Sequence, residues 1–297
     1  VVKELRENGE TSLTTREYLA AKVFRHTASY DTMIASYLTE RTGEKYPEKF
    51  TITFDKVQEL RYGENPHQSA AFYKGMNPQY SLANAKQLHG KELSYNNIQD
   101  GNAAIEILKD FEGQPAVVGL KHMNPCGVGI GKTIEEAWDK AYEADPVSIF
   151  GGIVAFNEPI HASVAEKLSK IFLEIIIAPA FDEDAFEILS KKKNIRLMQL
   201  DTSLEVNDKY KVTNVNDGLL VQDIDDHKIT AEDLRCVTNR KPTEEELEQL
   251  LFAWKVVKHV KSNAIVLVKD NMTIGVGAGQ MNRVGAAKIA IEQAGEK

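Results

Sequence analysis

A stretch in the middle of the chain recurs near its carboxyl end, and this repeat limits the possible folds more than any other feature. Residues 116–131 align with residues 264–279 without a gap. In both copies an apolar run, typical of a buried strand, leads to a lysine and then to glycines at matching positions. An amphipathic helix is expected before each copy, so the sequence predicts two related helix–strand–glycine loop–helix units. We expect a ligand site between them, where two strand ends face each other.

The two copies differ at one chemically important position. Lys121 is followed by His122, whereas the equivalent Lys269 is followed by Asp270. In open α/β sheets, ligands bind at the end of the sheet where strands lead into such loops. A lysine there can supply positive charge, and a histidine can move protons near neutral pH. The alternative is a solvated lysine beside a histidine that caps the strand, and the dipeptide alone leaves both open.

The pattern in the rest of the chain predicts an α/β protein. Residues 1–45 carry apolar residues at helical spacing, with no partner for the apolar face. The run from Thr15 to Tyr37 is long, so a break between two helices is expected within it. Residues 50–54 alternate like a strand. Residues 175–179 read as a buried strand with Glu174 at its start, and a capping box at residues 243–246 begins a strong helix.

Composition argues against several classes of function. The formal net charge is −8 and the only basic triplet is at residues 191–193, so nucleic acid is not an expected partner, although small anions are. Two cysteines do not make a disulfide framework. No signal peptide opens the chain and no apolar run is long enough to cross a bilayer, so we expect a cytoplasmic protein with no membrane partner. The absence of an initial methionine suggests a fragment or a processed chain.

Two further patterns have competing interpretations. Arg61 and Tyr62 open a polar loop that suits a phosphate and a stacked ring, but spacing alone slightly favours an ordinary hydrogen-bonded loop. The tripeptide at residues 124–126 faintly resembles half of a zinc deaminase site. A catalytic zinc needs three protein ligands and a water, and the required partners do not follow, so this hypothesis is weak. Metal-free group transfer by Lys121 and His122 is the competing hypothesis.

Seven short motifs, in order and spread over the chain, resemble those of the bifunctional AICAR transformylase/IMP cyclohydrolase family of purine biosynthesis. They are RYGENPHQ at 61–68, LSYNN at 93–97, LKHMNP at 120–125, SIFGG at 148–152, IIAP at 176–179, SNA at 262–264 and GAGQMNR at 277–283.

The resemblance implies a fold and a domain organisation. The implied fold has two cytidine-deaminase-like α/β/α halves without metal, preceded by a helical remnant of the cyclohydrolase domain. Residues 1–50 would be the last helices of that mostly missing domain, and residues 51–297 the transformylase domain. Its halves would cover about 51–225 and 226–297, the second being incomplete. The chain therefore resembles a family member truncated at both ends.

The resemblance also implies an activity. The family transfers the formyl group of 10-formyltetrahydrofolate to AICAR, giving FAICAR, without a metal, and its longer members convert FAICAR to IMP and water. Its transformylase sites form across a homodimer. The alternative is a catalytically incomplete fragment that only binds nucleotide and dimerises. Carried over by motif, the implied catalytic residues are Lys121 and His122, the AICAR contacts are Arg61, Tyr62, Gly151, Glu174, Asn263 and Arg283, and Val284 lies beside the folate.

Overall fold

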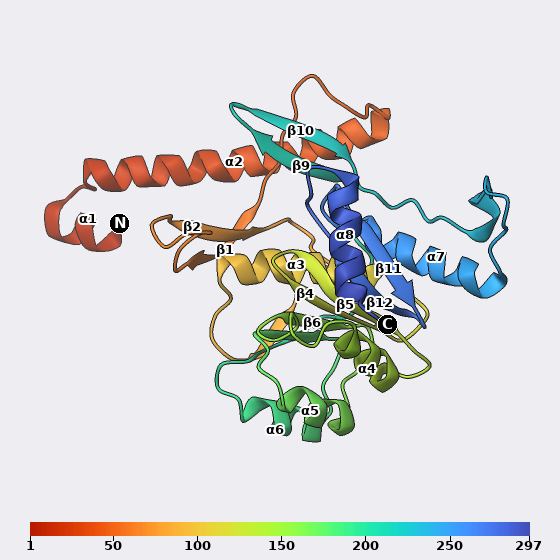
Figure 1. Ribbon diagram of the computed structural model, residues 1–297. Coiled ribbons are helices and arrows are strands. Elements are labelled where there is room, and N and C mark those ends of the chain that lie inside the picture. The colour runs from red at the N-terminus through yellow and green to blue at the C-terminus, as the bar shows by residue number, and fades with distance from the viewer. The chain divides into compact units, whose positions relative to one another are not determined.

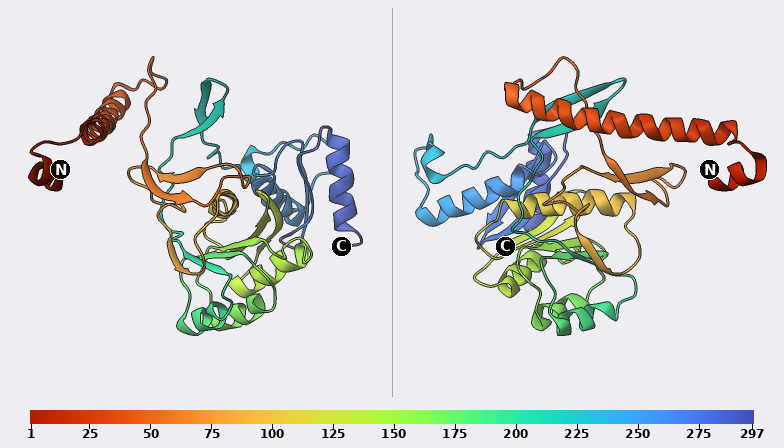
Figure 2. Two further views of the ribbon diagram at one scale, coloured as in Figure 1. Left: turned by 90° about the vertical axis from the view of Figure 1, so that its left-hand side faces the viewer. Right: turned by 180° about the vertical axis from the view of Figure 1, so that it is seen from behind.

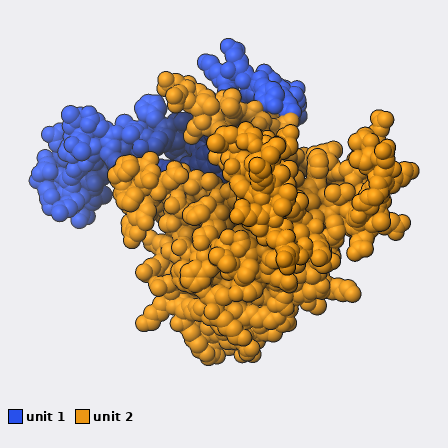
Figure 3. Space-filling model, in the orientation of Figure 1, with its two compact units in different colours: residues 1–56, 73–76 blue, residues 57–72, 77–297 orange.

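The computed structural model describes residues 1–297. The chain divides into two units, which Figure 3 distinguishes by colour. One consists of residues 1–56 and 73–76, and the other of residues 57–72 and 77–297. No helix combines the length and the apolar character needed to cross a membrane.

The smaller unit is mainly helical. α1 (Val2–Asn8) precedes α2 (Leu13–Thr42), which begins where the Ser12 side chain accepts a hydrogen bond from the Thr15 N–H at 3.2 Å. α2 runs for 30 residues without interruption, so the predicted break is wrong. It contains no proline or glycine that would stop it. None of its residues is buried.

A short hairpin follows α2. β1 (Asp55–Leu60) and β2 (Ala70–Lys74) form a two-stranded sheet, which the boundary between the two units crosses. The strand predicted at residues 50–54 is wrong, because regular pairing begins only at Asp55. Alternation over five residues does not by itself supply a partner strand.

An eight-stranded mixed sheet lies at the centre of the larger unit (Figure 1). Its strand order is β11-β12-β5-β4-β6-β7-β8-β3. β6, β7 and β8 are parallel to one another, and the other pairs are antiparallel. The predicted α/β fold is confirmed. The strands are β3 (Lys86–His89), β4 (Ala116–Lys121), β5 (Asn124–Ile130), β6 (Ile153–Phe156), β7 (Ile175–Ala178), β8 (Arg196–Gln199), β11 (Ile265–Lys269) and β12 (Met272–Gly277).

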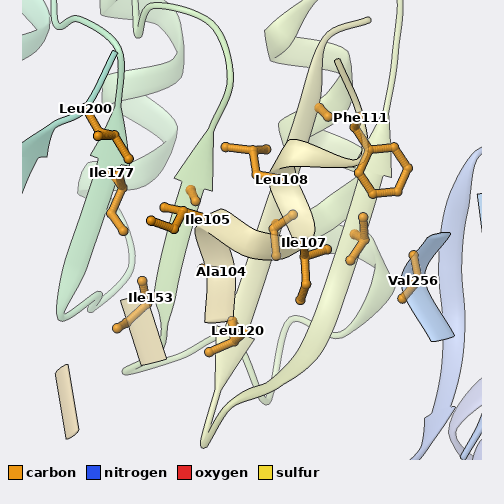
Figure 4. Close-up of a cluster of buried hydrophobic side chains, with 14 of the residues drawn as sticks. Ala104, Ile105, Ile107, Leu108, Phe111, Leu120, Ile153, Ile177, Leu200 and Val256 are labelled. Atoms are coloured by element: carbon orange, nitrogen blue, oxygen red, sulfur yellow. The ribbon is translucent and has the colours of Figure 1, made fainter. Parts of the chain in front are cut away.

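Helices cover both faces of this sheet (Figure 2). Successive residues of β4 point to opposite faces, so Val118 joins a core with α3 and α7, while Val117 joins a second core with α4, α5 and α6. Figure 4 shows part of the first core, with Ile105, Leu108, Leu120, Ile153 and Ile177 together. The helices are α3 (Tyr95–Lys109), α4 (Ile134–Ala144), α5 (Ala162–Ser169), α6 (Glu183–Ser190), α7 (Glu244–Val257) and α8 (Arg283–Ala294).

Between β8 and α7 the chain leaves the sheet. β9 (Tyr210–Val215) and β10 (Gly218–Asp223) form an antiparallel hairpin of their own. A short 3₁₀ helix, η1 (Ala231–Asp233), follows, and α7 then begins at its capping box.

The repeat is visible as two copies of a helix–hairpin–helix unit, α3–β4–β5–α4 and α7–β11–β12–α8. The predicted glycine loop is wrong: each copy turns back through two residues and continues as a second strand. The turns are His122–Met123, with φ of 53° and 60°, and Asp270–Asn271, with φ of 52° and 62°. Positive φ at both central residues is the geometry that suits a two-residue hairpin.

The glycines of β5 and β12 have a packing role. A Cβ on Gly127 or Gly129 would collide with backbone carbonyl groups of α4, at Ala141 and Ala137. A Cβ on Gly275 or Gly277 would collide with α8 in the same way. These strands therefore lack side chains where a helix backbone lies against them.

Replacing one of these glycines tests the packing. We expect Gly277→Ala to lower the free energy of unfolding by about 1–3 kcal/mol or more, because the new methyl group forces α8 away from β12. Gly75→Ala is the control, since its Cβ would meet only the Phe54 ring, at 4.0 Å. Denaturant unfolding of both variants checks this, and equal stabilities would contradict the packing role.

A buried ionic cluster joins the leading helices of the two copies. Asp110, at the end of α3, accepts hydrogen bonds from Lys258 Nζ at 2.9 Å and His259 Nε2 at 2.6 Å, just after α7. The three side chains are 14–17% exposed. Burial alone would raise the pKa of Asp110, but these hydrogen bonds and charges outweigh it and hold the pKa below its ordinary value.

The cluster predicts an acid-sensitive contribution to stability. Asp110→Asn should cost about 2–3 kcal/mol near neutral pH, because it leaves the partly buried Lys258 ammonium without its counter-charge. Because the folded-state pKa is lowered, this contribution is present above the ordinary pKa of 3.8 and is lost as the pH falls further. Urea unfolding at several pH values measures it. Glu187→Gln, in an exposed pair with Lys191, should change little, and a pH-independent loss in Asp110→Asn would contradict the assignment.

Candidate active site

The predicted site residues of the sheet lie at one of its ends. β4 runs antiparallel to β6, with Leu120 opposite Ile153, so the carboxyl end of β4 lies beside the amino ends of β6, β7 and β8. Lys121 thus lies where β4 leads into its turn, as expected, but at the end of the sheet where the parallel strands β6, β7 and β8 begin. The position of Lys121 follows from the antiparallel hairpin.

The two repeats run in opposite directions across the sheet. Met272 of β12 lies opposite Gly129 of β5, so the Asp270–Asn271 turn lies at the far end from the His122–Met123 turn. The expectation that two equivalent strand ends face each other is wrong. The first turn shares its end of the sheet with the open end of the second hairpin, where β11 begins and β12 ends.

Lys121 and His122 occupy the end of β4 and the first position of the turn. Lys121 is partly buried, and its Nζ donates a hydrogen bond to the carbonyl oxygen of Phe150 at 2.9 Å. The His122 side chain is exposed. The backbone carbonyl oxygen of His122 accepts a hydrogen bond from Asn124 Nδ2 at 3.0 Å. The lysine is therefore anchored to the loop before β6, while the imidazole faces solvent from a fixed turn.

Gly151 follows the residue that accepts from Lys121, and Glu174 is joined to the same loop through Gly152. Gly151 has φ 72°, and its N–H donates to the Phe172 carbonyl oxygen at 2.8 Å. Its positive φ explains why a glycine suits this turn. The Glu174 N–H donates to the Gly152 carbonyl oxygen at 3.0 Å. The loop that holds Lys121 therefore also fixes the start of β7, where Glu174 lies.

The Glu174 carboxylate is held by two neighbouring side chains. Its Oε2 accepts from Asn97 Nδ2 at 2.8 Å and lies 3.9 Å from Arg196 Nη1. Asn97 is only 6% exposed and is part of the capping box at the start of α3. The carboxylate is thus oriented by the amide of a buried side chain, and a hydrogen bond from a buried donor restricts where the carboxylate can point.

The second repeat supplies an amide and a guanidinium at the same end. The Asn263 N–H and Nδ2 both donate to the Gln280 carbonyl oxygen at 3.1 Å, and Arg283 Nη2 lies 3.5 Å from Asn263 Oδ1. The Lys261 N–H reaches Asn124 Oδ1 at 3.5 Å. This contact joins the segment before β11 to the strand that follows the His122 turn.

Three predicted site residues, Arg61, Tyr62 and Val284, make no side-chain hydrogen bond to the loop that holds Lys121. Arg61 donates to the Tyr62 hydroxyl at 3.0 Å, and its guanidinium lies 4.7 Å from the centre of that ring. These contacts join Arg61 to Tyr62, and they join neither side chain to the loop that holds Lys121. Val284, in the first turn of α8, is 64% exposed.

The metal hypothesis lacks its ligands. No group of three or more His, Cys, Asp or Glu side chains is arranged to hold a metal ion. Burial, aided by the nearby Asp145 carboxylate, raises the pKa of the Cys126 thiol to about 12. A metal ligand must be a thiolate, so this cysteine is a poor candidate.

Several polar residues at this end of the sheet carry no sequence signal of their own. Asp100, within α3, accepts from the Met123 N–H at 2.8 Å, and burial raises the pKa of its carboxyl. Asn97 and Asn124 were found only inside longer motifs, and Arg196 in none. Only the packing of their elements on the sheet, which the fold supplies, brings them together.

The fold and these contacts define a duplicated α/β protein with a candidate enzyme site built from both repeats. The family model for the AICARFT/IMPCHase bienzyme matches residues 1–293. The chain belongs to this family.

Curated relatives carry the name bifunctional purine biosynthesis protein PurH. The chain is 64% identical to that of Anoxybacillus flavithermus and 60% identical to that of Bacillus subtilis, over 298 residues each, covering all of this chain and 58% of each relative. The Oceanobacillus iheyensis protein is 62% identical over 283 residues, which is 95% of this chain and 55% of the relative. The chain thus spans somewhat more than half the length of these relatives.

The support of Glu174 can be tested by removing its amide partner. Asn97→Ala should lower the free energy of unfolding by about 1–2 kcal/mol, because the capping box and the bond to Glu174 are both lost. The control is Asn102→Ala on the same helix, whose side chain is exposed and bonds only Glu106. Thermal unfolding measures both variants, and a similar loss in Asn102→Ala would remove the special role of Asn97.

Proposed function

We propose that this chain catalyses formyl transfer from 10-formyltetrahydrofolate to AICAR, giving FAICAR and tetrahydrofolate. The observation that supports it best is the Lys121–His122 pair, anchored at the end of the sheet that also carries Glu174 and Asn263. The family and the relatives' name support purine biosynthesis. For the longer protein we propose IMP cyclohydrolase activity as well, and for the chain a cytoplasmic location and a homodimer whose transformylase sites cross the interface.

The chemistry assigns a separate task to each member of the pair. The AICAR amine is conjugated with its carboxamide and is a poor nucleophile, so a base that removes its proton assists attack on the formyl carbon. His122 suits this task, because an imidazole exchanges protons near neutral pH. Lys121 suits stabilisation of the oxyanion that forms. The bond to the folate nitrogen then breaks, and that nitrogen takes up a proton.

The remaining predicted residues are proposed to hold the substrates. Arg283 and Arg61 suit a phosphate or a carboxamide, and Glu174 suits a ribose hydroxyl or an amine donor. Tyr62, Gly151 and Asn263 complete the proposed AICAR contacts, with Val284 beside the folate. No step in this scheme calls for a metal. The side-chain contacts of Arg61 and Tyr62 join the two residues to each other and not to the loop of Lys121. This favours one alternative, a fragment that binds nucleotide and dimerises without turnover.

Replacing the proposed base tests the function. His122→Asn keeps a residue that tolerates positive φ and removes the imidazole, so formyl transfer should fall by about 10²–10⁴-fold. Release of tetrahydrofolate from AICAR and 10-formyltetrahydrofolate measures the rate. Asp270→Asn makes a comparable change in the equivalent turn at the other end of the sheet and should leave the rate unchanged.

The outcomes separate the two candidates. Undiminished turnover by His122→Asn would contradict the role of His122. Binding of AICAR by the wild-type chain, seen by calorimetry, without any turnover would favour the non-catalytic alternative.

A further inference from the structure

Both hairpin turns are held by a side chain from the helix that precedes them. Asp100 of α3 accepts from the Met123 N–H at 2.8 Å, and Gln249 of α7 accepts from the Asn271 N–H at 2.9 Å through Oε1. Gln249 also donates to Asn271 Oδ1 at 2.7 Å. Met123 and Asn271 are the second residues of the two turns.

The two holding residues are structural equivalents. Asp100 lies six residues after its N-cap Ser94, and Gln249 lies six residues after its N-cap Thr243. One copy of the repeat therefore fixes its turn with a carboxylate and the other with a neutral amide. Since the amide suffices in the second copy, holding the turn does not explain why the first copy carries a charge.

In each copy, the charge of the helix residue that holds the turn suits the first residue of that turn. Next to Asp100 the turn begins with His122, and next to Gln249 it begins with Asp270. A carboxylate beside Asp270 would be repelled, whereas one beside His122 faces a group that can become positive. The Asp100 Oδ1 atom accepts from the N–H of Met123, the residue directly after His122, so the carboxylate lies at the turn that carries the imidazole.

The charge on Asp100 has an energetic cost. Burial raises its pKa, and the charge of Glu174 adds to the rise, while the hydrogen bonds from the turn and the charge of His122 oppose it. Because the net shift is upward, ionisation of Asp100 is less favourable in the folded than in the unfolded chain, so at neutral pH it lowers stability. A charge kept at a cost to stability beside a proposed base indicates a functional role.

We propose that Asp100 is a positioning residue for the formyl transfer proposed above. It fixes the turn that presents His122, and its negative charge stabilises the positive charge that the imidazole gains when it takes the proton of the substrate amine. The inference rests on the proposed function and adds to it a residue that acts through His122.

Three variants separate the two tasks of Asp100. Asp100→Asn keeps an acceptor oxygen for the Met123 N–H, as Gln249 does for Asn271, but removes the charge. We expect its kcat to fall about tenfold with an unchanged KM for AICAR, while its melting temperature stays equal or rises. Asp100→Ala should lose the hydrogen-exchange protection of the Met123 amide as well. Gln249→Ala is the matched control, which should lose protection at Asn271 and keep full kcat.

The pH dependence gives a second readout. Protonating Asp100 has the same effect on charge as Asp100→Asn, so the ratio of the wild-type rate to the Asp100→Asn rate should shrink towards one as the pH falls through the raised pKa of Asp100. The charged groups that face Asp100, His122 from the turn and Glu174 from the start of β7, are present in both proteins.

The failures are distinguishable. If the wild-type chain turns over and Asp100→Asn is equally active, the proposed role of the Asp100 charge is overturned and the proposed function stays intact. A parallel loss of kcat in Gln249→Ala would show a merely structural effect and would also overturn it. Absence of turnover in the wild-type chain would overturn the proposed function, and this inference with it.

Discussion

Close packing of a helix backbone on a glycine-bearing strand is the constraint on which the site depends. Gly127 and Gly129 let α4 lie directly against β5, and Gly275 and Gly277 do the same for α8 on β12. A side chain at any of these positions would push the helix away and loosen the hairpin beneath it. The turn at the end of the first hairpin is therefore part of a rigid, doubly covered sheet. A site on such an element is held more exactly in place than one on a free loop.

The sequence alone predicts the repeat, the α/β class and the buried strands, because each rests on local apolar patterning. It does not predict the second strand of each hairpin. Glycines after a strand indicate a loop when only neighbours in sequence are considered, and the helix residues whose backbone packs on these glycines lie eight to fifteen residues farther along the chain. The sequence also does not predict the direction of the second repeat, because similarity between two segments does not determine how their strands pair. The domain boundaries inferred from the resemblance stay predictions.

Local sequence patterns single out some residues of the candidate site but not others. Lys121 and His122 stand out because they end an apolar run, and Glu174 because it begins one. Asp100 and Arg196 give no local signal, since the first lies within an amphipathic helix and the second at a strand start, where charged residues are common. Their position near the turn and near Glu174 depends on how α3 and β8 lie on the sheet. Periodicity identifies which face of an element is covered, but it does not identify which polar residue at its edge meets another.

Duplication explains why one end of the sheet can specialise. The copies share a helix, a two-residue turn and glycines, so the architecture of each is supported without any need for charge at the turn. The copies differ in the residues after the lysine and in the helix residue that holds the turn, His122 with Asp100 against Asp270 with Gln249. Because the copies run in opposite directions, the first places its turn where the second places Asn263 and Arg283. Two unlike ends of one motif thus share one end of the sheet, and a change of charge in one copy need not be matched in the other.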